Sequence, residues 1–115
     1  MAVRVYCESP GTLLRKIKAA IRDGSIETWE VDDAGDFTHV PEQWSKKAWL
    51  RPKIMDDHLI FNIVGQESKP MARAVYGVYH GRFIEMLLNH FDRDFDRAYA
   101  TALGAKGDYI EGWFK

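Results

Sequence analysis

Apolar residues along this chain switch between two spacings, and this switching constrains the fold more than any other feature of the sequence. Over 3–7 they recur at every second position, which is the period of a half-buried strand. Over 13–21 the spacing is helical, over 26–64 the two-residue period returns, and over 71–91 the helical spacing returns. One helix among early strands, followed by strands and then helices, is typical of an α+β fold.

Turn residues delimit the first strand and the first helix. Residues 8–11 end the strand, and Ser9 before Pro10 is a suitable N-cap for a helix that ends near Gly24. We expect this helix to pack one apolar stripe against a sheet. The stripe consists of Leu13, Leu14, Ile17, Ala20 and Ile21.

Two hairpins are expected in the middle of the chain. The first spans 26–40 around an acidic turn, and the second spans 47–64 around a turn at 56–57. Pro52 cannot donate a ladder hydrogen bond, so we expect the middle of its strand to lie at an edge or a bulge. The strand over 58–64 carries apolar residues at positions of both faces, which predicts a central strand covered on both sides.

The longest helix is expected to begin at Ser68 and Pro70 and to end near Phe91. A further short helix, separate or as a bend of the same one, is expected to end at Gly104. Its helical spacing is carried by Phe95, Ala98, Tyr99, Ala102 and Leu103. Residues 107–115 form either a frayed tail or a short strand, and docking is favoured by their aromatic residues Tyr109, Trp113 and Phe114.

These elements predict one α+β domain over residues 1–115, a length that suits a single core. We expect a mostly antiparallel, twisted sheet of about five strands with helices packed chiefly on one face. Along the chain the expected order is strand, helix, four strands and two helices. The order of the strands within the sheet is left open.

Charge and cysteine content exclude several classes of protein. Sixteen Lys and Arg residues stand against seventeen Asp and Glu residues, so no bulk positive field attracts nucleic acid or lipid. Cys7 is the single cysteine, which excludes an internal disulfide and fits a reducing compartment. No apolar stretch approaches the ~20 residues of a membrane span, and the first residues lack an apolar signal core. We therefore expect a soluble cytoplasmic protein without a membrane partner.

Motifs for phosphate binding, dinucleotide binding and hydrolysis are absent from the sequence. The acidic turn at 32–36 lacks the ligand spacing of a calcium loop. The four histidines, which are His39, His58, His80 and His90, do not pair at helical spacing. The sequence therefore predicts neither a metal nor a cofactor.

Three polar residues of the longest expected helix, Arg73, Tyr76 and His80, share one face with Phe83 and Phe91. Buried polar groups without partners cost ~1 to 3 kcal/mol each, so these side chains need partners or a ligand. One interpretation is a pocket in which Arg73 holds an anion, Tyr76 orients it and His80 binds or transfers a proton.

The same helix contains Gly77 and Gly81, which each lower helix stability by ~1 kcal/mol. We expect them to allow close approach of a bound molecule or of another backbone. The alternative to a pocket is a structural network. In that network His80 donates to a backbone carbonyl and Arg73 pairs with an acidic residue of the first hairpin.

Charge is distributed unevenly along the chain. Residues 1–25 carry five basic and two acidic side chains, and residues 26–45 carry six acidic and no basic ones. Residues 46–53 contain four cations near two tryptophans, an arrangement that single-stranded nucleic acid binding uses. The residues concerned are Trp44, Lys46, Lys47, Trp49, Arg51 and Lys53. Strand lysines also protect sheet edges, and tryptophan is commonly part of a core.

Three functions follow as hypotheses. The first is a non-enzymatic protein-interaction or regulatory module with a protein partner. The second is a small enzyme or a binder of small anionic ligands, which would use Arg73, Tyr76, Gly77 and His80. The third is a single-strand nucleic-acid binder that uses the 44–53 segment. A walled concavity at His80 would favour the second, and exposed Trp44 and Trp49 beside cations would favour the third.

Overall fold

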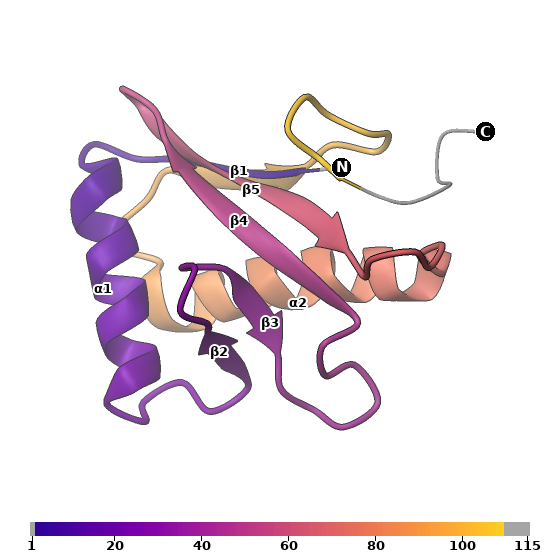
Figure 1. Cartoon of the computed structure of the whole chain (residues 1–115). Helices are drawn as coiled ribbons and strands as arrows, with labels where there is room; N and C mark the ends of the chain where they lie inside the picture. The colour runs from indigo at the N-terminus through magenta and orange to yellow at the C-terminus, as the bar shows by residue number, and fades with distance from the viewer. Residues whose placement is uncertain (1, 110–115) are drawn as a thin grey trace.

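The α+β class is confirmed by the computed structural model, which describes residues 2–109 (Figure 1). These residues form six strands rather than the expected five, together with two helices. The strands are β1 (Ala2–Tyr6), β2 (Trp29–Val31), β3 (Phe37–His39), β4 (Ala48–Ile54), β5 (His58–Gly65) and β6 (Arg97–Ala100). The helices are α1 (Pro10–Arg22) and α2 (Arg73–Phe91).

All six strands belong to one antiparallel sheet, in the order β2-β3-β4-β5-β1-β6. The first strand of the chain is therefore internal, because β1 lies between β5 and β6. Val3 is opposite Phe61 on one side and Ala100 on the other. The expected central position of β5 is confirmed, since it pairs with β4 and β1.

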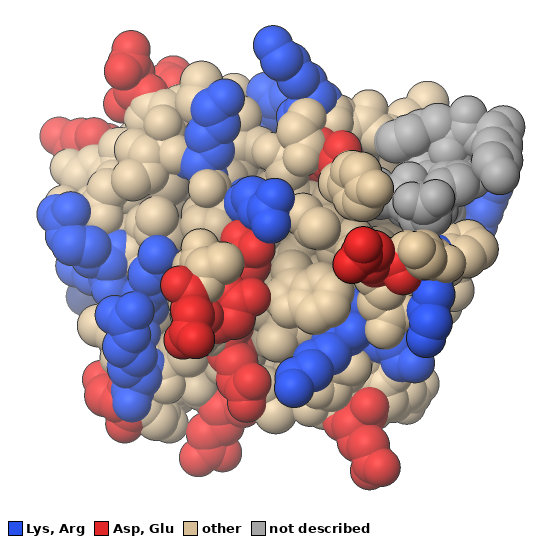
Figure 2. All heavy atoms as spheres, in the orientation of Figure 1, with Lys and Arg blue, Asp and Glu red and all other residues tan. Residues whose placement is uncertain are grey.

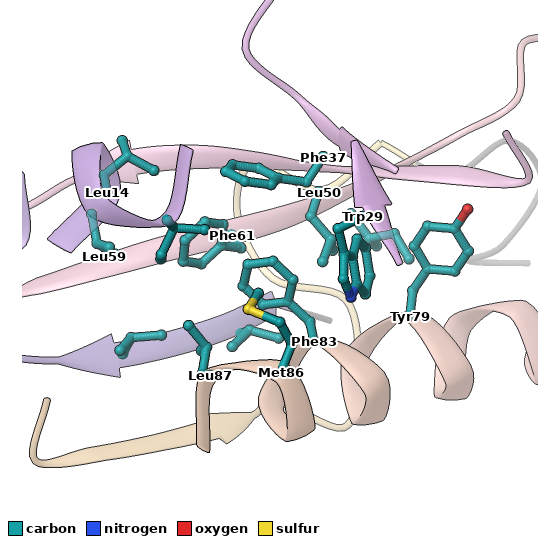
Figure 3. Close-up of a cluster of buried hydrophobic side chains, with 14 of the residues drawn as sticks. Leu14, Trp29, Phe37, Leu50, Leu59, Phe61, Tyr79, Phe83, Met86 and Leu87 are labelled. Carbon is teal, nitrogen blue, oxygen red and sulfur yellow. The ribbon is translucent and has the colours of Figure 1, made fainter. Parts of the chain in front are cut away.

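Both helices pack on the same face of the sheet, as expected, with α2 running along the sheet and α1 at one end (Figure 1). The two predicted helical stripes share one core with the inward side chains of the strands. At its centre the Phe83 ring lies 4.6 Å from Phe61 and 5.1 Å from Trp29, measured between centroids (Figure 3). Neither helix is long and apolar enough to cross a membrane, judged over residues 2–109.

The other face of the sheet is covered less than expected. On β5 the inward residues Leu59, Phe61 and Ile63 are fully buried, whereas the outward residues Ile60 and Val64 are only half-buried. The prediction that this strand is covered on both faces is therefore wrong along most of its length, because both helices lie on one side.

Pro52 lies in the part of β4 that pairs with β5 but no longer with β3. Strand β3 pairs with β4 only between Phe37 and Leu50, although β4 continues to Ile54. The Met55 amide donates to the His58 carbonyl, and the alternation of an antiparallel ladder then turns the Pro52 nitrogen away from β5. The expected edge position is confirmed locally, since no ladder donor is needed there.

The short helix expected before Gly104 is wrong, because residues 97–100 form strand β6. Ala98 lies opposite Val5 and packs against the core, while Arg97 and Tyr99 point to the other face. Without β6, the apolar strand β1 would expose a free edge, so strand pairing outweighs the local helical spacing.

The helix boundaries follow the predictions with one shift. Ser9 occupies the N-cap position of α1, although its side chain makes no capping hydrogen bond, and Gly24 follows the helix with φ of 86°. Helix α2 begins at Arg73 rather than near Pro70, because Ala72 is still extended.

After β6 the chain crosses one end of the helix-free face. The Asn62 amide donates to the Lys106 carbonyl and to the Asp108 carboxylate, and Tyr109 continues along β5 beside Val64. A Cβ on Gly107 would lie 2.7 Å from the Asn62 side chain, so only glycine fits there. Docking is thus found for the backbone of Tyr109, whose side chain is 57% exposed, whereas Trp113 and Phe114 lie outside the described residues.

Candidate functional site

Two of the three polar residues predicted for the face of α2 are buried. Tyr76 is 3% exposed and His80 is 2% exposed, whereas Arg73 is exposed at the first residue of the helix. The His80 Nδ1 lies 2.6 Å from the Tyr76 carbonyl, and because a carbonyl only accepts, Nδ1 carries the proton. Burial raises the pKa of Tyr76 to about 12, so its hydroxyl stays protonated.

The buried face of α2 is rotated from the predicted one toward Tyr79 and Met86, which are buried in the core. No other backbone of residues 2–109 approaches Gly77 or Gly81, since both are exposed and a Cβ at either would meet no described atom within 4 Å, and the close approach of a bound molecule stays a prediction. Four surface cavities lined by described residues lie elsewhere, and the predicted site residues of α2 line none of those four. A ligand at Arg73, Tyr76 and His80 stays a prediction.

The predicted nucleic-acid segment divides into two parts. Trp44 is half-buried and packs against the core, and its carbonyl accepts a hydrogen bond from the Tyr79 hydroxyl, whose oxygen points out of the core in Figure 3. Lys46 and Lys47 are exposed in the turn before β4. Only the remaining residues, Trp49, Arg51 and Lys53, alternate on the helix-free side of β4.

Those three residues belong to a larger surface, which we call the open face. It consists of the side chains that point away from the helices on β4, β5, β1 and β6, except at the end of the sheet where residues 106–109 contact Asn62 and Val64. Four of these side chains are cationic and three are tyrosine or tryptophan, and none carries a carboxylate. The residues of the open face are Arg4, Tyr6, Trp49, Arg51, Lys53, His58, Ile60, Arg97 and Tyr99.

Tyr6 organises one row of the open face. The His58 ring stacks on it at 4.6 Å between centroids with 21° between planes, and the Arg97 guanidinium lies 4.2 Å from the ring centroid. These contacts follow from register, since Tyr6 is opposite both residues. The ring of Tyr99 stacks beside Tyr6 at 6.2 Å. Tyr6 thereby holds a cation and an imidazole in fixed positions.

A second row crosses the four strands through Arg4. Lys53 is opposite Ile60, Ile60 is opposite Arg4, and Arg4 is opposite Tyr99. The Nε of Arg4 is shut off from solvent and has no hydrogen-bond acceptor among the described residues. A donor left in this state is unfavourable by ~1 to 3 kcal/mol.

The cations of the open face differ in their partners. Arg51 pairs with Asp36 at 3.0 Å, and this contact raises the pKa of Arg51. Arg4, Lys53 and Arg97 form no ion pair within 4.0 Å among residues 2–109. His58 is hydrogen-bonded through Nδ1 to Asp57 at 2.7 Å, which lowers the pKa of that carboxyl. Positive charge is therefore available mainly at Arg4, Lys53 and Arg97.

A recess of about 490 Å³ adjoins the open face beside Tyr6 and Arg97. Its wall also contains Arg93 and four acidic residues, which are Glu8, Asp57, Asp94 and Asp96. Lys16 pairs with Asp94 at 2.9 Å at the neighbouring end of α1. The recess thus has an acidic rim, in contrast to the open face.

The basic first segment and the acidic second segment of the sequence lie next to each other in the folded molecule. Basic side chains gather over α1 and acidic ones lie next to them over the β2–β3 hairpin (Figure 2). The Lys18 ammonium comes within 3.5 Å of the position of a Cβ on Gly35, in the hairpin turn. The hairpin carboxylates therefore have cationic neighbours in the same chain.

His39 on β3 is buried, with 2% exposed. It lines a cavity of about 220 Å³ together with residues of β2 and α2, including Trp29, Arg82 and Glu85. Among the described residues, no three His, Cys, Asp or Glu side chains are grouped so that they could hold a metal ion.

The sequence alone indicated Trp49, Arg51 and Lys53 but missed the rest of the open face. The alternation of Arg4 and Tyr6 with Val3 and Val5 was a usable signal, since it places two polar side chains on one side of the first strand. Comparisons of the chain with protein-family models, with curated proteins and with solved structures find no match.

Proposed function

We propose that this protein is a non-enzymatic protein-interaction module that works in the cytoplasm and binds its partner through the open face. The observation that supports this most is the composition of that face, where arginine, tyrosine and tryptophan stand together without a carboxylate. These residue types supply most of the binding energy in protein interfaces. Residues that already hold each other in place lose little side-chain freedom on binding, as Tyr6 and Arg97 do.

Two features favour a protein over single-stranded nucleic acid as the partner. Stacking with bases needs free aromatic ring faces, but His58 and Arg97 already contact the ring of Tyr6. The formal net charge of the chain is −1, so long-range attraction to a polyanion is weak.

The test compares three forms of the tagged protein as baits in cell extract, with captured proteins quantified by mass spectrometry. The open-face variant carries Lys53→Glu, Arg97→Glu and Tyr99→Ala, all at exposed positions. The control variant carries Arg15→Glu and Arg22→Glu, which reverse exposed charges on α1. We expect a set of proteins that wild type and the control retain and the open-face variant loses.

Thermal unfolding of the three baits verifies that all are folded. If the open-face variant retains the same proteins as wild type, the proposal is wrong. If nuclease treatment of the extract removes every specific capture, the partner is nucleic acid and the third hypothesis replaces this one.

A further inference from the structure

We infer that the open face recognises an extended acidic segment, one carboxylate of which docks on Arg4 between Lys53 and Arg97. This inference rests on the proposed function and names the chemistry of its partner. Arg4 is central because its row joins all four strands of the face, from Lys53 on β4 to Tyr99 on β6. A ligand at Arg4 therefore lies between Lys53 and Tyr99, with Arg97 in the neighbouring row.

The guanidinium of Arg4 is built for an anion that the described chain does not supply. Its Nε is a donor without an acceptor, and no described carboxylate lies within 4.0 Å of the group. A carboxylate engages a guanidinium side-on through two parallel hydrogen bonds, and such a contact with the buried Nε requires the Arg4 side chain to move toward the ligand. Binding would then supply the acceptor that this donor lacks among the described residues.

Arg4 and Arg97 both lie near Tyr99. The pKa of Tyr99 is raised, chiefly by its hydrogen bond with Tyr6, while the charges of Arg4 and Arg97 act in the opposite direction. Two like charges beside one phenol repel each other, and a bound anion relieves that repulsion. The hydroxyl groups of Tyr6 and Tyr99 offer further hydrogen-bonding capacity nearby.

The spacing of the cations predicts the spacing of the acidic residues. Lys53 and Arg4 lie two strands apart, which corresponds to roughly 10 Å at the usual strand separation. An extended peptide covers that distance in about three to four residues, and side chains about four positions apart point to the same side of it. The acidic rim of the recess repels the same segment, so its carboxylates are placed over the Lys53–Arg4 row and away from Asp57 and Asp96.

The inference is tested by fluorescence anisotropy with purified protein and defined probes. The acidic probe is a fluorescein-labelled Gly/Ser peptide with two Glu residues four positions apart, which share one face of an extended chain, and the matched probe carries Gln at both positions. Oligo-dT serves as the nucleic-acid probe. We expect wild type to bind the acidic peptide, to ignore the Gln peptide and to lose affinity as salt rises.

Substitutions of Arg4 assign the site. Arg4→Gln should weaken acidic-peptide binding roughly tenfold, Arg4→Lys should weaken it less because the charge stays, and Arg22→Gln on α1 should leave it unchanged. Because Arg4 belongs to an internal strand, amide chemical-shift changes in wild type give an independent measurement. They should centre on Arg4, Ile60 and Tyr99.

Each other outcome overturns the inference. If the acidic peptide does not bind, or binds Arg4→Gln as well as wild type, the acidic anchor is wrong. In that case the proposed function still stands wherever the open-face variant loses its captured proteins. Binding of oligo-dT that depends on Arg4, without binding of the peptide, would overturn the inference and the proposed function together.

Discussion

The environment of His39 differs strongly from that of the same side chain in water. Its ring stacks on Trp29 at 4.5 Å, and its Nδ1 donates to the Thr28 carbonyl at 2.8 Å. Its Nε2 is buried and has no hydrogen-bond partner among residues 2–109. Burial lowers the pKa of His39, assisted by Arg82 and opposed by the Thr28 hydrogen bond and by Glu85. The folded protein therefore holds this imidazole neutral.

This environment predicts that the protein loses stability in mild acid. His39 in the unfolded chain titrates near its ordinary pKa of about 6.5, whereas in the folded chain it resists protonation. The unfolded state thus binds the extra proton more readily, so the contribution of His39 is fully present above about pH 6.5 and declines as the pH falls below that value. Urea unfolding at about pH 7.5 and about pH 5.5 measures the difference.

Two glutamine variants assign the effect to His39. His39→Gln should show a smaller loss of stability between the two pH values than wild type does. His90→Gln removes an exposed histidine of the same cavity and should keep the wild-type loss. Equal pH dependence in His39→Gln and wild type would show that another group is responsible.

Two neighbouring leucines of helix α2 test which face of the helix is buried. Leu87 is fully buried, whereas Leu88 is 55% exposed. Leu87→Ala should lower the free energy of unfolding by about 2 to 5 kcal/mol, because it leaves a cavity in the core. Leu88→Ala should change it by no more than about 0.5 kcal/mol. Urea unfolding of both variants checks this, and similar losses would contradict the observed face of the helix.

The two glycines of α2 predict a gain of stability. Space for a methyl group is open at Gly77 and at Gly81, and the helix is regular at both. Alanine at either position should raise the free energy of unfolding by up to about 1 kcal/mol, since it restrains the unfolded backbone. Thermal unfolding of each variant provides the measurement. A decrease would mean that the glycines serve a contact after all.

The spacing of apolar residues predicted most elements of this fold, because α1, α2 and both hairpins each have a recognisable pattern within their own residues. For α1, the apolar stripe that begins at Leu13 and the N-cap at Ser9 both lie within the element itself. Strand β6 has no comparable signature, since Ala98 and Tyr99 fit helical spacing equally well. Its conformation depends on pairing with β1, which lies far away in the sequence.

The open face, at the scale of the whole molecule, could not be predicted in full from the sequence for the same reason. The alternation of Trp49 and Lys53 is visible in the sequence, but their proximity to Arg4 and Arg97 requires the order of strands in the sheet. Strand order depends on which edges pair, and apolar spacing carries no information about pairing. The burial of Tyr76 and His80, in contrast, could be predicted from the sequence, because both residues belong to one helix and its spacing shows which face they share.

The sheet order predicts a gradient of backbone protection across the molecule. Strands β5 and β1 are paired on both sides, whereas β2 is a three-residue edge strand. In native-state hydrogen exchange, the paired amides of β5 and β1 should exchange only by global unfolding, and those of β2 should exchange by local opening. Two-dimensional NMR in deuterated buffer follows each amide. Equal protection of β2 and β5 would contradict the order of strands.

The internal position of β1 also has a consequence for synthesis on the ribosome. The Ala2 amide bonds to the Thr101 hydroxyl across 99 residues, so β1 meets β6 only after the other described strands have been made. At a translation rate of about 5 to 20 residues per second, β1 waits roughly 5 to 20 s for this neighbour. During that interval β5 is the only partner available to β1 among the described strands. The nascent chain therefore exposes one edge of β1 to pairing with other chains until β6 has been made.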